Sequence, residues 1–155
     1  MPRTNGLNRF CSILVTVVVM LIASPTRALD NPDVPDFVAE FEARAKPYEV
    51  KISEHAGITD VVTRNYADYE KFLDTELNRS YSALTGKLSS SGRQQLVQSQ
   101  KKWLAFRDAE FAFIDANWSL QRFGTSSHLS RGAYRAELVR ERTRTLLNYL
   151  KNYPG

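Results

Sequence analysis

The stretch TDVVTRNYADYEKFLDTELNRSYSALTG, residues 59–86, decides the fold that this chain can adopt. Its apolar and aromatic residues recur every three or four positions, which is the period of one face of an α-helix. These residues are Val62, Tyr66, Tyr69, Leu73, Leu77, Tyr81 and Leu84. Thr59 is suited to begin the helix and Gly86 to end it. The stretch therefore predicts a helix of about 26 residues with one buried face.

A second helix is predicted directly after this one. Serines at 89–91 can cap its start, and an apolar stripe then runs as far as Trp118. Gln100 and Arg107 lie on that stripe, and polar side chains on a buried face need partners. Because the connection is short, the two helices are expected to pack as an antiparallel hairpin.

The hairpin predicts partners for both polar residues. Folding the chain about the turn places Gln100 near Asn78, and it brings Arg107 within reach of Asp74 and Glu70. We therefore expect a hydrogen bond between Asn78 and Gln100 and a buried ion pair from Arg107 to one of the two carboxylates. The simplest role for such a network is to fix the register of the two helices.

The remaining segments complete an all-α pattern. A last helix is expected from Ser130 to just before Pro154, with a weaker apolar stripe and most of its arginines outside. Residues 37–46 predict a short helix that is capped by Asp36 and ends before Pro47. No segment alternates with period two over a useful length. The predicted fold is a small helical domain of three long helices, an antiparallel hairpin plus a C-terminal helix, with a short N-terminal helix.

The first residues have the layout of a secretory signal peptide. Arg3 and Arg9 precede an apolar run, and Pro25 then leads to the small residue Ala28. The run is shorter than the roughly 20 residues that span a bilayer. We expect cleavage near Ala28 and a periplasmic or secreted location, the alternative being an uncleaved segment that contacts the membrane. The predicted organisation is a signal peptide at 1–28, an acidic arm with a short helix at 29–57, and a helical domain at 58–155.

Charge is unevenly distributed along the chain. The 155 residues include 21 Lys and Arg and 17 Asp and Glu, and the formal net charge is +4. Residues 29–76 hold 12 acidic and 5 basic residues, whereas residues 77–155 hold 5 acidic and 13 basic residues. The basic half alone would suggest nucleic acid as a partner, but the predicted export argues against it.

No pattern typical of catalysis, a cofactor or a metal site is present in the sequence. His55 and His128 are far apart and neither belongs to a cluster with ligand spacing. Asp108 and Glu110 point to different faces of their helix, so they make a poor carboxylate pair for a glycosidase. We therefore expect a protein that is not an enzyme and that holds no cofactor and no metal.

Two stretches, LDTELNRSYSAL (73–84) and QSQKKWLAFRDAEFAF (98–113), carry a more specific pattern. They resemble the N-terminal domain of the LprI-like lysozyme-inhibitor family, over roughly residues 58–150. The matching residues are Asp74, Leu77, Asn78, Tyr81, Gln100, Trp103, Arg107 and Asp108. Family members usually carry two cysteines at positions that are Phe111 and Asn65 here, so the disulfide of that hairpin is missing.

The resemblance implies an exported protein that binds and inhibits a lysozyme-type muramidase, with the motif residues in a structural role. Because c-type lysozymes are strongly basic, acidic residues of the N-terminal half are the expected contacts. The candidates are Asp36, Glu40, Glu42, Glu49 and Glu54. The alternative is a non-catalytic, envelope-associated helical domain that binds another protein or peptidoglycan. The sequence makes no prediction of the oligomeric state.

Overall fold

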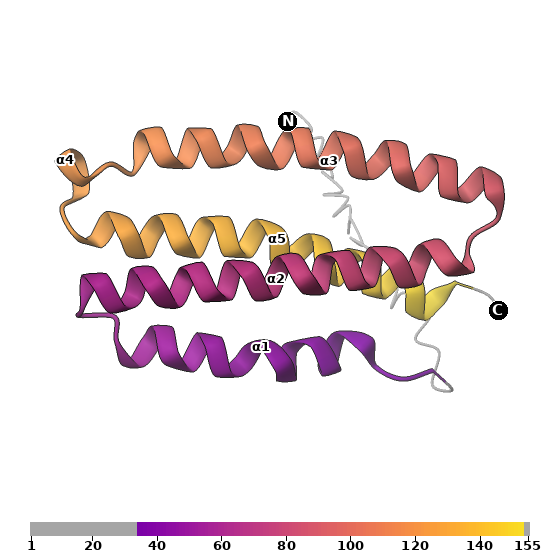
Figure 1. Ribbon diagram of the computed structural model, residues 1–155, viewed down its shortest axis with the longest axis horizontal. Helices are drawn as coiled ribbons and strands as arrows, with labels where there is room; N and C mark the ends of the chain where they lie inside the picture. The colour runs from indigo at the N-terminus through magenta and orange to yellow at the C-terminus, as the bar shows by residue number, and fades with distance from the viewer. Residues whose placement is uncertain (1–33, 154–155) are drawn as a thin grey trace, which may run out of the picture.

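The computed structural model describes residues 34–153 of the chain (Figure 1). Those residues form five helices and no strand, which confirms the all-α prediction. The helices are α1 (Phe37–Glu54), α2 (Thr59–Lys87), α3 (Ser90–Asn117), α4 (Leu120–Phe123) and α5 (Ser126–Asn152). None of these helices combines the length and the apolar character that a membrane crossing requires. The predicted signal segment, 1–28, lies outside the described residues.

The α2 and α5 helices form the centre of the molecule. They lie side by side and run in the same direction, with α1 on one side and α3 on the other (Figure 1). The hairpin of α2 and α3 is antiparallel, as predicted, but α3 packs mainly on α5. The reason lies in the α3 stripe, in which only Leu96 and Ile114 are buried. Such a stripe offers too little apolar surface to pack closely along α2.

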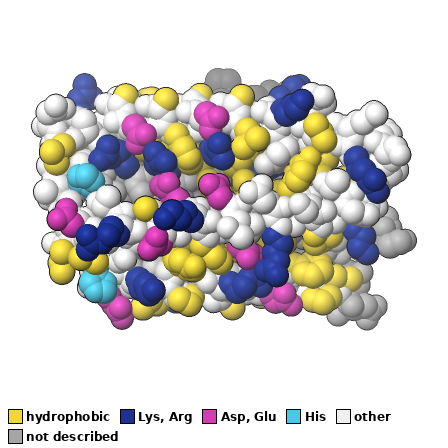
Figure 2. All heavy atoms as spheres, viewed as in Figure 1, with side chains coloured by type: hydrophobic (Ala, Val, Ile, Leu, Met, Phe, Trp, Pro, Cys, Tyr) yellow, Lys and Arg dark blue, Asp and Glu magenta, His cyan; other side chains and the backbone are white. Residues whose placement is uncertain are grey.

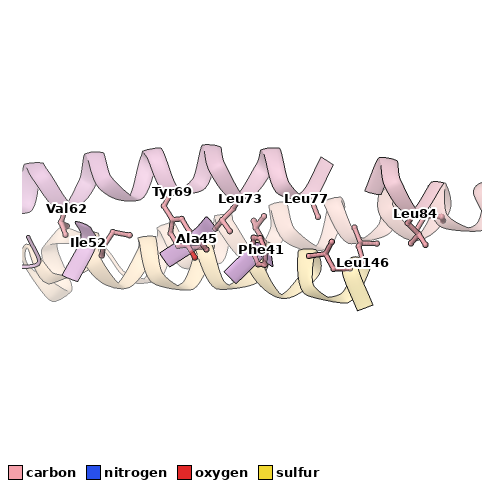
Figure 3. Close-up of a cluster of buried hydrophobic side chains, with 13 residues drawn as sticks. Phe41, Ala45, Ile52, Val62, Tyr69, Leu73, Leu77, Leu84 and Leu146 are labelled. Carbon is pink, nitrogen blue, oxygen red and sulfur yellow. The ribbon is translucent and has the colours of Figure 1, made fainter. Parts of the chain in front are cut away.

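One hydrophobic core is formed mainly by α1, α2 and α5, and Leu96 of α3 also belongs to it (Figure 3). The predicted stripe of α2 supplies most of it, because five of its seven residues are buried and Tyr66 and Tyr81 are half-buried. The buried apolar residues of the other two helices are Phe41, Ala45 and Ile52 on α1 and Ala136, Val139, Leu146 and Leu147 on α5. Residues from before position 58 are therefore part of the same core as the predicted helical domain.

The α1 helix is longer than the sequence predicted. It was expected to end before Pro47, but it continues through this proline to Glu54. Proline lacks the N–H that would bond to the carbonyl of Ala43, and both residues lie on the exposed side, where water can bind that carbonyl. Ala45 and Ile52 are buried on the opposite face. Their burial favours a continuous helix over the local preference of proline.

Two of the predicted helix start caps are confirmed and two are wrong. Thr59 is wrong because it is the first residue inside α2, with Ile58 at the N-cap position and no capping side chain. The Asp36 carboxylate accepts a hydrogen bond from the backbone N–H three residues further on, at 3.0 Å. The Ser89 hydroxyl accepts one from the Gly92 N–H at 3.2 Å. Ser130, however, lies inside α5, which begins at Ser126. The chain reverses earlier than predicted because the single turn of α4 is followed by Gly124 at a positive φ of 58°.

Small residues bring α5 close to α2. The apolar stripe that the sequence predicts for this helix is Tyr134, Leu138, Thr145, Leu146, Tyr149 and Leu150. It is right at Leu146, which is buried, but wrong at Tyr134 and Tyr149, which are exposed, whereas Gly132 and Ala136 are buried. A β-carbon added at Gly132 would lie 2.3 Å from the ring of Tyr66. The absence of a side chain at this one position therefore sets the distance between the two central helices.

We expect the Gly132→Ala variant to be destabilised by about 1–3 kcal/mol, because the added methyl group overpacks the contact with Tyr66. Thermal unfolding followed by circular dichroism measures the effect. The matched control is Gly86→Ala on α2, where a β-carbon meets nothing within 4 Å. That variant should be unchanged or more stable by about 0.5 kcal/mol. Equal destabilisation of both variants would contradict the close packing at Gly132.

Candidate functional site

The α2 residues of the sequence motif have different surroundings. Leu77 is buried in the core and Tyr81 is half-buried against it. Asp74 and Asn78 are exposed. This half of the motif therefore contributes one buried anchor and two residues at the surface.

The predicted hydrogen bond between Asn78 and Gln100 is wrong. The Gln100 side-chain oxygen instead accepts two hydrogen bonds from Arg142 of α5, from Nε at 3.1 Å and from Nη2 at 3.0 Å. The Cζ atom of Arg142 also lies 5.8 Å from the centre of the Trp103 ring. Because α3 packs on α5, its glutamine finds its partner there and not on α2.

Arg107 makes the predicted ion pair with Asp74, but at a long distance. Its Nη1 lies 3.9 Å from Oδ1 of Asp74, whereas the neighbouring Asp108 accepts hydrogen bonds from Nε and Nη2 at 2.9 and 2.7 Å. Its Cζ lies 5.7 Å from the ring centre of Trp103 and 5.6 Å from that of Phe111. Arg107 is half-buried between these two rings, not fully buried as predicted.

Arg135 of α5 occupies the next position along the same junction. Its Cζ lies 4.3 Å from the ring centre of Phe111. Its guanidinium donates two hydrogen bonds of 3.1 Å to Glu70 of α2 and one of 3.0 Å to Asp115 of α3. The five side chains that alternate here form what we call the arginine ladder: Arg142, Trp103, Arg107, Phe111 and Arg135. In Figure 2, basic and acidic side chains gather between α3 and the α2–α5 pair.

The two positions at which the resemblance implies cysteines have other contacts in this chain. Phe111 is a member of the arginine ladder. The Asn65 side chain donates a hydrogen bond of 2.9 Å to the backbone carbonyl of Lys51, which links α2 to the last turn of α1. Each of the two residues therefore joins its helix to a neighbour without a covalent bond.

We expect Arg135→Ala to lower the free energy of unfolding by about 2 kcal/mol, since it removes charge-assisted hydrogen bonds to two carboxylates and a contact with an aromatic ring. Arg64→Ala is the control, because Arg64 is exposed and its change should stay within about 0.5 kcal/mol. Chemical denaturation of the two variants beside the unmodified protein tests this. Equal stabilities of the two variants would show that the contacts of Arg135 contribute nothing to the stability of the fold.

The acidic residues expected to face a basic partner fall into two groups. Glu42 and Glu49 are half-buried and bind arginines of α5. Glu42 pairs with Arg140 and, at 2.6 Å, with Arg144, while Glu49 lies 2.9 Å from Arg140. These two carboxylates are therefore committed to holding α1 on α5. The other three candidates are exposed: Asp36, Glu40 and Glu54.

The internal pairing of Glu42 affects its proton affinity. Burial acts to raise the pKa of its carboxyl, but the hydrogen bonds and charges of Arg140 and Arg144 outweigh burial and bring the pKa below its usual value. A carboxyl whose pKa is lowered by folding stabilises the protein at pH values above the pKa that it has in the unfolded chain. That contribution is lost as the pH falls through the lowered, folded value.

The stability difference between the unmodified protein and Glu42→Gln should therefore be largest near neutral pH and should shrink below about pH 4. Thermal unfolding at a series of pH values measures it. Glu54→Gln serves as the control, because Glu54 is exposed and has no ion pair among residues 34–153. A Glu42→Gln difference that does not change with pH would contradict the pairing.

Two hollows lie at opposite ends of the helical body. An apolar groove of about 700 Å³ lies beside the α2–α3 turn and the end of α5. Its hydrophobic lining consists of Leu84, Leu88, Leu96, Tyr149 and Tyr153. A polar hollow of about 440 Å³ near the start of α5 is lined by His128, Arg131 and the Arg135 pairs. Within residues 34–153, no three His, Cys, Asp or Glu side chains are grouped so as to hold a metal ion.

An exposed aromatic cluster lies where α3 ends and α5 begins. The Trp118 ring centre lies 5.9 Å from that of Phe113, 6.4 Å from that of Phe123 and 5.0 Å from that of Tyr134. Phe113, Phe123 and Tyr134 are 54%, 49% and 47% exposed, respectively. We call this surface the aromatic tip and define it as Phe113, Trp118, Leu120, Arg122, Phe123 and Tyr134. Contiguous exposed apolar side chains of this kind mark interaction sites.

The aromatic tip is not among the features that the sequence predicts. The apolar stripe that runs as far as Trp118 predicts a buried residue there, whereas Trp118 is half-buried. A signal was nevertheless present in NWSLQRFG, residues 117–124, because segments that reverse the chain are usually polar and this one carries two large aromatic residues and a leucine.

Comparison with known proteins adds one finding. The family model described as lysozyme inhibitor LprI matches residues 53–146. The matched region runs from the end of α1 into the second half of α5, so it includes the arginine ladder and the aromatic tip. No curated protein and no solved structure matches the chain.

Proposed function

The chain belongs to the lysozyme inhibitor LprI family, and we propose from this that it is an exported, non-enzymatic protein that binds a lysozyme-type muramidase and blocks its cleft. The observation that carries the proposal is the family match over 53–146. The signal-like layout of the first 28 residues supports export to the compartment in which such enzymes act.

The helical body has properties that suit an inhibitor. Its core and its ion pairs hold four long helices in one arrangement, and a preorganised surface loses little conformational freedom on binding. Asp36, Glu40 and Glu54 remain exposed and would attract a basic partner at a distance. Their contribution would be to the rate of association more than to the final contact.

A lysis assay tests the proposal directly. We expect the purified protein, titrated against a c-type lysozyme acting on bacterial cells, to inhibit clearing in a saturable way near an equimolar ratio. The double variant Glu40→Lys, Glu54→Lys should associate more slowly at low salt, with a smaller difference at physiological salt.

Failure of inhibition at a large excess, by protein shown to be helical by circular dichroism, would contradict the proposal. Co-sedimentation of the same protein with purified peptidoglycan would then support the alternative of an envelope-associated, non-inhibitory domain. A g-type lysozyme run in parallel establishes whether inhibition depends on the class of enzyme.

A further inference from the structure

The aromatic tip is a surface that the helical body holds in place but does not bury. Trp118 is half-buried and contacts the rings around it, so it anchors the tip to α3 and α5. Phe123 and Leu120 project from α4 and are about half exposed. Figure 1 shows that α4 lies at one end of the molecule, where the chain passes from α3 to α5. A surface at the end of an elongated body can enter a concave site.

The tip also carries a positive charge that forms no ion pair within the described part of the chain. Arg122 lies on α4 between the exposed Leu120 and Phe123. Among residues 34–153, no carboxylate forms an ion pair with Arg122, in contrast to Arg135 and Arg140 on α5. The tip therefore combines one exposed guanidinium with several apolar side chains. Arginine and aromatic residues dominate the binding energy of protein interfaces.

The cleft of a glycoside hydrolase has the complementary chemistry. Two carboxyl groups flank the bond that is cleaved, and in retaining enzymes they lie only about 5–5.5 Å apart. In lysozyme one of them lies in an apolar pocket, which raises its pKa, while the other stays ionised. A guanidinium can donate paired hydrogen bonds to the ionised carboxylate. Flanking apolar side chains can cover the surfaces on which sugar rings lie.

Resting on the proposed function, we propose that the aromatic tip is the inhibitory element and enters the substrate cleft of the muramidase. Arg122 lies beside the catalytic carboxyl groups of the enzyme, and Phe123 and Leu120 cover the adjacent apolar surface. The exposed acidic residues of α1 steer the approach but lie outside the cleft. The partner is thus a protein with an acidic, carbohydrate-binding cleft.

Binding of variants to a c-type lysozyme, measured by calorimetry, tests the proposal. Arg122→Glu and Phe123→Ala should each weaken the affinity by about tenfold or more, as expected for central interface residues. Trp118 is not changed, because its partial burial would confuse binding with folding. Thermal unfolding should show that both variants remain folded at the temperature of the binding measurement, since both side chains are at the surface.

Two control variants on α3 match these changes in chemistry. Lys101→Glu reverses an exposed charge, and Phe106→Ala removes an aromatic ring that is 51% exposed. Both should bind within about twofold of the unmodified protein, as expected outside an interface. A chitin trisaccharide, which fills the enzyme cleft, should compete with the inhibitor for binding.

The outcomes separate this inference from the proposed function. If the unmodified protein binds and the trisaccharide competes, but the tip variants bind equally well, the tip is not the inhibitory element and the proposed function stands. If the trisaccharide does not compete, the protein does not occupy the cleft, and both this inference and the cleft-blocking part of the proposed function are overturned. If the unmodified protein does not bind any lysozyme, both are overturned. Loss of binding in the tip variants alone, together with competition, supports both.

Discussion

The packing of α5 on α2 is the contact on which the rest of the structure depends. It requires Gly132, because any side chain there would meet the ring of Tyr66. Once α5 is in place, its arginines reach in two directions. Arg140 and Arg144 bind Glu42 of α1, and Arg135 and Arg142 reach side chains of α3. The arginines of α5 thus bind side chains of both α1 and α3.

The two sides of this central pair are stabilised differently. The α1 helix buries apolar residues in the shared core and adds ion pairs, so it is held by both effects. The α3 helix buries only Leu96 and Ile114 and relies on the arginine ladder between them. Cation–π contacts of partly desolvated groups contribute roughly 1 kcal/mol each. The ladder therefore holds α3 against α5 and α2, and through α3 it positions the aromatic tip.

The sequence predicted the parts of the fold that large apolar residues and capping residues specify. The stripe of α2 and the caps at Asp36 and Ser89 belong to this group. It failed where small residues form an interface, since Gly132 adds nothing to a hydrophobic pattern. The prediction that most arginines of the last helix lie at the exposed surface was also wrong. These arginines are half-buried because they pair with residues that are distant in the chain. Acidic and basic halves that are separate in sequence are thereby interleaved in space.

Amide hydrogen exchange of the protein with and without bound c-type lysozyme locates the contact surface most directly. We expect added protection over residues 113–134, which span the aromatic tip, with little change in α1 or the middle of α2. Protection of the apolar groove at the other end, near residues 84–99 and 148–153, would contradict this expectation. Such a result would place the enzyme on the opposite end of the helical body.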